Sequence, residues 1–295
     1  MNIDSKKVLI LSAIIALVVS LVGVKLFSNT NGTKDDTVSS KSTLATVLDR
    51  KEIRVGYVVY PPDMIKDPNT GELSGIFHDA LEKAASNLGL KVNWVEEVGW
   101  GTMIEGLKAG RYDMVGSSVW PNSPRAVQAD FTIPLTYSLI SVAARIDDTR
   151  FDKSYDALNS PDVKISIIDG ELTQSIVKEQ FPNMKVISLP QLADKSQFLL
   201  DVSTRKADVA FVPPLEIDRF LKNNPDTIKI VQPKNPLRVY GNVMMFLQGQ
   251  EAFKSMLNVA LTEEINSGYI DSLVKKYQTS PNSFYPVAKP FELPQ

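Results

Sequence analysis

An arginine that follows a predicted buried strand has the clearest chemistry in this sequence. Arg125 comes shortly after the apolar residues 113–119, which predict a strand. Its guanidinium carries a planar set of donors that matches a carboxylate in bidentate geometry. The residues around it predict the start of a helix, whose N–H groups would add to an anion site. The indicated chemistry is capture of a carboxylate. The alternative is a surface arginine on a first helical turn, where the helix dipole does not favour a cation.

The composition argues against several other kinds of chemistry. The chain has no cysteine, which rules out disulfides, thiolate metal sites and cysteine nucleophiles. Because His78 is the single histidine, we expect neither a Ser-His-Asp triad nor a multi-histidine metal site, and we expect no metal and no cofactor. The net charge is −2 without a basic block, so we expect no nucleic acid partner.

Strand-like and helix-like patterns alternate along the 295-residue chain. Short β-branched runs predict strands at residues 53–59, 92–98, 113–119, 139–144, 164–168, 185–189, 208–212, 227–231 and 243–247. Helical spacing predicts helices at residues 77–88, 197–206, 215–222 and 251–277, the last one broken near Gly268. This alternation predicts an α/β fold with parallel sheets covered on both faces. Ligands of such sheets bind at the carboxyl ends of strands, which directs attention to the loops after Val59, Val119, Ile168 and Val212.

The N-terminal segment reads as a membrane or secretion signal. Lys6 and Lys7 precede an uncharged apolar run at residues 8–24. We predict that residues 1–28 are a signal anchor or a signal peptide, and we favour the uncleaved anchor because no Ala-x-Ala cleavage site follows. The lysines place the N-terminus inside, with residues 8–27 in the membrane and the rest on the periplasmic or extracellular side. Residues 29–43 are polar and predict a flexible tether.

Four motifs follow one another in the order and at the spacing of a known family. They are Ile53-Arg54-Val55-Gly56 with Tyr60-Pro61-Pro62, the turn and helix start at residues 71–79, Trp100 with residues 107–113, and Arg125 with Asp130-Phe131-Thr132. Together they make the chain resemble the bacterial extracellular solute-binding proteins of family 3, the polar amino-acid type of ABC-transporter binding protein. The match continues more loosely to about Tyr277, so it covers nearly all of the soluble part.

The resemblance implies a fold and a domain arrangement. It implies a two-lobed periplasmic-binding-protein-like α/β fold of type II, with two crossover strands near residues 138–143 and 239–242. Lobe one would comprise residues 44–138 with 243–280, and lobe two residues 139–242 with the hinges. Residues 281–295 would form an extended tail. In such proteins the lobes close on a ligand by a hinge motion.

The resemblance also implies ligand-binding roles for three residues near the predicted strand 113–119. The arginine at the place of Arg125 holds the α-carboxylate of the ligand in the family. Ser118 lies where a backbone or hydroxyl group contacts the ligand. Ser123 lies where the family has a threonine, although Ser123 or Asn122 could act only as a helix cap.

The aromatic and lobe-two positions are implied in the same way. Tyr60 and Trp100 match positions whose rings sandwich the ligand, and Trp120 would narrow the pocket or add an aromatic wall. For each ring the alternative is ordinary core packing. Thr173 lies in a segment that resembles a helix start contacting the ligand carboxylate, with one extra residue in the spacing.

Two departures from the family leave the ligand class open. The aspartate that usually pairs the ligand ammonium is replaced by Pro213, and Glu216 is a possible substitute. Val58 and Val59 stand where another aspartate is often found. Since a buried ammonium needs a partner, a carboxylate without an α-ammonium, or a cation held by aromatic rings, is an open alternative.

The expected function is therefore that of a binding protein. We predict a monomeric receptor of an ABC importer that binds a small carboxylate-containing ligand, an amino acid or organic acid, and presents it to a membrane permease. No catalytic residue is needed for this function. The alternatives are a periplasmic dehydratase-like enzyme that uses Glu171 or Glu216 as an acid, and a ligand-sensing module without transport.

Overall fold

The structure is a computed structural model that describes residues 42–231, 236–278 and 284–287. The predicted signal or anchor at residues 1–28, nearly all of the predicted tether and most of the predicted tail lie outside the described residues. Within the described ranges, every helix is too short or too polar to cross a membrane.

A single mixed sheet runs through both lobes. In order, its strands are β4 (Lys91–Glu97), β1 (Glu52–Tyr57), β5 (Met114–Val119), β12 (Arg238–Leu247), β7 (Thr136–Arg145), β10 (Val209–Val212), β8 (Lys164–Ile168) and β9 (Lys185–Leu189). Beside this path, β6 (Ala129–Phe131) pairs with β12, while β11 (Ile228–Val231) and β13 (Tyr285–Pro286) pair with β7. A separate hairpin is formed by β2 (Ile65–Lys66) and β3 (Leu73–Ser74). We call the part built on β1, β4, β5 and β6 lobe one, and the part built on β8–β11 lobe two.

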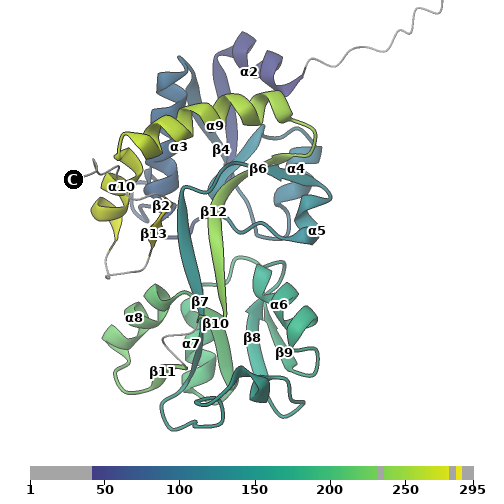
Figure 1. The fold of residues 1–295 in the computed structure, drawn as a ribbon, viewed down its shortest axis with the longest axis vertical. Helices are drawn as coiled ribbons and strands as arrows, with labels where there is room; N and C mark the ends of the chain where they lie inside the picture. The colour runs from purple at the N-terminus through teal and green to yellow at the C-terminus, as the bar shows by residue number, and fades with distance from the viewer. Residues whose placement is uncertain (1–41, 232–235, 279–283, 288–295) are drawn as a thin grey trace, which may run out of the picture. The chain divides into compact units, whose positions relative to one another are not determined.

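The two long strands β7 and β12 cross between the lobes (Figure 1). They pair antiparallel, from Thr136 opposite Asn242 to Ile140 opposite Arg238. The rest of β12 pairs with β5 and β6 in lobe one, and the rest of β7 pairs with β10 and β11 in lobe two. This is the expected two-lobed α/β fold with two crossover strands.

The prediction of parallel sheets is correct for only part of the molecule. In lobe one, β1 is parallel to β4 and β5, and in lobe two, β8 is parallel to β9 and β10. The crossing strands are antiparallel to their neighbours in both lobes. β7 carries the chain from lobe one into lobe two, and β12 carries it back to lobe one.

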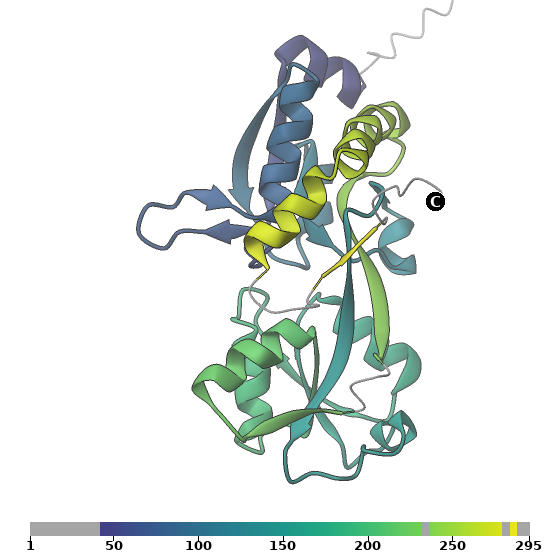
Figure 2. The same ribbon diagram turned by 60° about the vertical axis from the view of Figure 1, so that its left-hand side comes forward.

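Each lobe has apolar clusters on both faces of its sheet, because alternate strand residues point to opposite faces. In lobe one, Met114 and Met244 belong to one cluster, and Val115 and Met245 to the other. The first is covered by α2 (Thr43–Arg50), α3 (Ile76–Asn87), α9 (Glu251–Asn266) and α10 (Tyr269–Tyr277), and the second by α4 (Met103–Lys108). Figure 2 shows α3 beside α10 on this lobe.

The helices of lobe two are divided in the same way between the two faces. The 3-10 helix η1 (Tyr155–Leu158) and α6 (Leu172–Gln180) cover one face, and α7 (Ser196–Ser203) and α8 (Pro214–Asn223) cover the other. The predicted break in the last long helix is confirmed. Gly268 has a φ of +76° between α9 and α10, a left-handed conformation that glycine adopts without a steric penalty.

One carboxyl group of α9 is buried without a partner. Glu264 is 2% exposed, and neither of its carboxyl oxygens has a hydrogen-bond partner. Burial raises the pKa of Glu264 to about 8, although the nearby Lys83 lowers it. The folded chain therefore favours the neutral carboxyl at neutral pH, whereas the unfolded chain ionises it.

Replacing Glu264 with Gln should stabilise the fold at pH 8 and have little effect at pH 4. Near pH 4 both the folded and the unfolded wild type largely hold the proton. As the pH rises toward 8 the unfolded state loses it first, so the free energy of unfolding falls in the wild type but not in the variant. We expect a gain of at least about 1 kcal/mol at pH 8 in urea unfolding. The exposed neighbour Glu263→Gln is the control, and equal gains at both pH values would contradict the assignment.

Candidate ligand-binding site

A small cavity lies where the carboxyl ends of the strands of both lobes meet. Its volume is about 10 Å³, close to the least that holds one water molecule. Lobe one contributes residues that follow or end β1, β4 and β5, and lobe two contributes residues that follow β8 and β9. The lining residues are Tyr60, Trp100, Ser118, Trp120, Arg125, Glu171, Leu172 and Lys195. The structure thus brings five of the seven predicted site residues together.

Arg125 lies in the short helix α5 (Ser123–Ala126) and is held by backbone carbonyl groups. One of its terminal nitrogens donates to the Trp120 carbonyl at 3.0 Å, and the other donates to the Gly170 carbonyl of lobe two at 3.1 Å. Burial lowers the pKa of Arg125, while the charge of Glu171 opposes this effect. Among the described residues, no carboxylate lies within ion-pair distance of the guanidinium. Arg125 is therefore a half-buried cation with donors available to an anion.

The aromatic residues form a cage beside Arg125. Tyr60 and Trp100 meet edge to face, with ring centroids 6.0 Å apart. Trp120 stacks on Tyr240 at 5.4 Å and donates through Nε1 to Oδ1 of Asn242 at 2.7 Å. Tyr60, Trp100 and Trp120 all line the cavity, so they are placed as a ligand sandwich would require.

Asn242 links the cage to the crossing strands. Its Oδ1 also accepts from the Ser138 hydroxyl at 2.9 Å, and its Nδ2 donates to the Thr136 hydroxyl at 2.8 Å. Asn242 is fully buried on β12, and both partners lie on β7. The wall of the cavity is thereby attached to both crossover strands.

Lys195 occupies the cage with its ammonium group. Its Nζ lies 3.8 Å from the ring centroid of Tyr60, 5.1 Å from that of Trp100 and 5.5 Å from that of Trp120. It also forms an ion pair of 2.9 Å with Oε1 of Glu171, and the two side chains are 11% and 5% exposed. Sequence reasoning missed Lys195. It follows β9, and extending the strand-end rule to the loop after Leu189 would have drawn attention to it.

Two predicted residues lie outside the cavity lining. The hydroxyl of Thr173 is buried and donates to Oε2 of Glu171 at 2.9 Å, so it orients that carboxylate. Ser123 is exposed at the first turn of α5. The cap of that helix is Asn122, whose side chain accepts from the backbone N–H of Arg125 at 2.9 Å.

A second buried carboxyl group stands behind the cavity. Asp63 is fully buried, and neither its carboxyl oxygens nor the Ser118 hydroxyl has a hydrogen-bond partner of good geometry. Burial raises the pKa of Asp63 to about 7, while the neighbouring Ser118 and Lys195 lower it. Sequence reasoning did not select Asp63, because an aspartate beside two prolines also fits an exposed turn.

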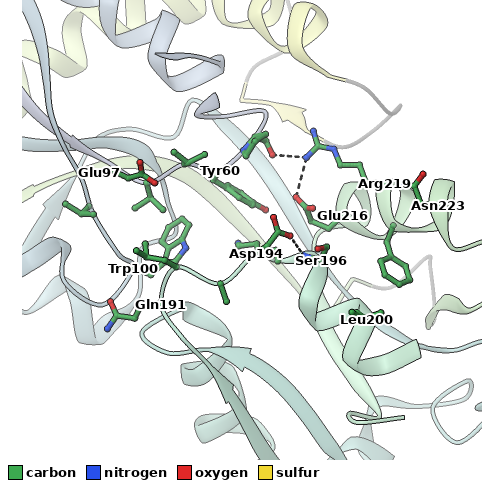
Figure 3. Close-up of a pocket in the computed structure, with 18 of the residues that line it drawn as sticks. Tyr60, Glu97, Trp100, Gln191, Asp194, Ser196, Leu200, Glu216, Arg219 and Asn223 are labelled. Atoms are coloured by element: carbon green, nitrogen blue, oxygen red, sulfur yellow. Dashed lines mark hydrogen bonds and ion pairs between the residues drawn. The ribbon is translucent and has the colours of Figure 1, made fainter. Parts of the chain in front are cut away.

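A groove of about 800 Å³ adjoins the cavity and is lined by both lobes (Figure 3). Tyr60, Trp100 and Lys195 line both spaces. The groove carries carboxyl groups from Glu97, Asp194 and Glu216. On one wall Arg219 of lobe two donates to the Pro61 carbonyl of lobe one at 3.1 Å, and this hydrogen bond links the lobes. The guanidinium of Arg219 also lies 3.6 Å from the carboxylate of Glu216. Burial raises the pKa of Glu216.

The two lobes also meet through two glycines. A Cβ atom on Gly170 would lie 2.6 Å from the Cα atom of Gly101, closer than such atoms approach in proteins. The backbone N–H of Gly101 also donates to Gln191 of lobe two at 3.3 Å. Closure at this point therefore requires that Gly170 has no side chain.

Gly170→Ala should hold the lobes apart, because its methyl group occupies the space of the Gly101 backbone. Gly89→Ala is the matched control. Both glycines have positive φ, +78° and +69°, so both variants carry the left-handed strain of about 1 kcal/mol. Only Gly170 is crowded, since nothing lies within 4 Å of a Cβ on Gly89. In small-angle X-ray scattering we expect a larger radius of gyration for Gly170→Ala alone. An unchanged radius would contradict the closed contact.

The site offers binding groups and no metal centre. Across the described ranges, no group of three or more His, Cys, Asp or Glu side chains is placed to hold a metal ion. The geometry instead combines a half-buried guanidinium, three rings and an ion-paired carboxylate where the two lobes meet. That combination can hold a small charged molecule and release it when the lobes separate.

Comparison with known proteins agrees with this architecture. A probable histidine-binding protein of Campylobacter jejuni is 23% identical, over 89% of this chain and 97% of the relative. The L-cystine-binding protein TcyA of Bacillus subtilis is 25% identical, over 84% of this chain and 89% of the relative. A probable amino-acid ABC transporter-binding protein of Haemophilus influenzae is 25% identical, over 68% of this chain and 74% of the relative.

Solved structures share the fold at low sequence identity. An ancestral amino acid-binding protein, described as a precursor of cyclohexadienyl dehydratase, has a TM-score of 0.68 and 24% identity, over 80% of this chain and 99% of that chain. A solute receptor for L-cysteine of Neisseria gonorrhoeae has a TM-score of 0.68 and 16% identity, over 83% of this chain and 99% of that chain. Residues 53–280 match one family along their whole length, and the chain belongs to the bacterial extracellular solute-binding proteins, family 3.

Proposed function

We propose that this protein captures a free amino acid outside the cytoplasm and that Arg125 binds the α-carboxylate of that ligand. The observation that carries the proposal is the half-buried guanidinium, which has no carboxylate partner among the described residues. Removing a cation from water is costly unless an anion compensates for it. Two backbone carbonyls satisfy part of its donors, and a bidentate carboxylate would satisfy more.

The charges around Tyr60 support a ligand that also carries an ammonium group. Three carboxyl groups lie near this ring, those of Asp63, Glu171 and Glu216, against the two cations Lys195 and Arg219. An ammonium group would restore the balance when Asp63 is ionised. In this proposal Glu171 takes the role of the aspartate that Pro213 replaces.

The relatives support the same ligand class and a role in transport. Their names refer to histidine, L-cystine and amino-acid ABC transport. We therefore propose that the protein works as a monomer, delivers its ligand to an ABC permease, and is held at the membrane by residues 8–27. Ser118, Tyr60, Trp100 and Trp120 would contact the ligand directly. Thr173 would affect ligand binding indirectly, by orienting the carboxylate of Glu171. Ser123 would do so by its place in the first turn of α5, the helix that carries Arg125.

A dehydratase-like activity is the second candidate, since one structural neighbour is described as a precursor of such an enzyme. Glu216 is the better acid, because burial raises its pKa toward the range of a general acid. Glu171 is held by Lys195 and Thr173 and is less free to transfer a proton. Incubation with prephenate-like acids separates the two functions. Turnover would replace binding as the function, and a heat of binding without turnover would exclude the enzyme.

Arg125→Ala should weaken ligand binding by about 2–5 kcal/mol, the range for removing one partner of a buried charge pair. Thermal-shift screening of amino acids and organic acids identifies the ligand first, because a ligand that binds only the folded chain stabilises it. Titration calorimetry then compares Arg125→Ala, Arg125→Lys and the surface control Arg111→Ala. Arg125→Lys should recover only part of the loss, since lysine lacks the planar fork. An unchanged affinity in a folded Arg125→Ala protein would contradict the proposal.

A further inference from the structure

The cage that faces the proposed carboxylate site is filled by a side chain of the protein itself. Lys195 presents a primary alkylammonium group to three rings of lobe one and to Glu171 of its own lobe. Each of these contacts is one that a ligand ammonium would make. Cation–π contacts are strongest where water is excluded, and this ammonium is nearly buried.

A ligand cannot enter the cage while Lys195 remains there. The cavity has about 10 Å³ of free volume, which is too little for any amino acid. If Lys195 left without a replacement, Glu171 would remain buried with only the Thr173 hydroxyl as a partner. Breaking a buried ion pair by removing one partner is strongly unfavourable. Displacing Lys195 avoids this cost when the incoming molecule carries a cationic group that takes over the ion pair with Glu171.

The adjoining groove gives the displaced side chain a place to go. Lys195 lines both the groove and the cavity. The carboxyl-bearing residues Asp194 and Glu216 line the groove. The lysine stem has four rotatable carbons, so its ammonium can change sides while its backbone stays at the start of α7. In the groove the ammonium would regain water and negatively charged neighbours.

We propose that Lys195 is an internal ligand, which holds the ammonium position of the cage in the free protein and must be displaced by the ammonium group of the bound molecule. This inference rests on the proposed function, because it assigns the second charged group of the same ligand. It makes Lys195 a specificity-determining residue. Ligands that carry an amino group exchange with it, and simple carboxylic acids do not.

The test supplies the ammonium group without any amino acid. Lys195→Ala empties the cage, and n-butylammonium chloride offers the cage an alkylammonium group as a separate molecule. Binding is followed by calorimetry and by the fluorescence of Trp100 and Trp120. We expect the variant to bind n-butylammonium at least tenfold more tightly than the wild type, in which the tethered lysine competes at a high effective concentration. The neutral analogue 1-butanol should not show this difference.

Matched variants separate the cage from general effects. Lys206→Ala also removes a lysine of lobe two from a buried carboxylate, Asp201, but it lies outside the cage and its own side chain is 53% exposed. It should bind like the wild type. Adding Glu171→Gln to Lys195→Ala should weaken n-butylammonium binding again. Equal binding by the wild type and Lys195→Ala, or no binding by a folded Lys195→Ala protein, would overturn the proposal.

The wild-type protein gives a second readout that does not depend on the folding of a variant. With Nζ 3.8 Å from the Tyr60 ring centroid, the ε-methylene protons of Lys195 should be shifted upfield by the ring current. If the ε-methylene protons of Lys195 had the chemical shift of an ordinary lysine in the free protein, the proposal that Lys195 is an internal ligand would be overturned. Neither measurement involves Arg125. A negative result in these two experiments would therefore leave the assignment of Arg125 to the ligand carboxylate intact. In the same way, an unchanged affinity in Arg125→Ala would leave the role of Lys195 as an internal ligand intact.

Discussion

Bringing two lobes together around charged groups requires that every buried charge finds a partner. The closing edge contains a guanidinium, an ammonium and several carboxyl groups, and the surrounding dielectric is low. The protein resolves this with its own atoms. Backbone carbonyls of both lobes accept from Arg125, and Glu171 receives Lys195 and the Thr173 hydroxyl. Among the described residues, this leaves Arg125 without a carboxylate partner and the carboxyl oxygens of Asp63 without a hydrogen-bond partner, and in our proposal these two positions define what the site can bind.

The scaffold explains how these groups meet. The carboxyl ends of parallel strands in both lobes point to one gap, so loops after β1, β4, β5, β8 and β9 converge there. Because Gly101 and Gly170 meet backbone to backbone, the lobes approach without an intervening side chain. The small cavity is a result of this close approach.

Much of the architecture could be predicted from the sequence, and the reasons are local. Apolar periodicity predicted the strands and helices, and Gly268 predicted the helix break. The order of motifs indicated the lobes and pointed to Arg125, Ser118 and the rings. The antiparallel direction of the crossing strands required knowledge of which strand lies beside which. Asp63 carries no local signal, because an aspartate beside prolines also fits an exposed turn. Lys195 has only the weak signal that it follows a strand end, and a lysine before a helix is usually a surface residue. Their burial depends on the convergence of both lobes.

The attachment of Trp120 to Asn242 couples the cage to the hinge. The indole is fixed by a hydrogen bond to β12, and the same amide reaches two hydroxyls on β7. The ring of Trp120 is therefore fixed relative to the paired segment of β7 and β12. One wall of the cage belongs to the same rigid unit as the strands that join the two lobes.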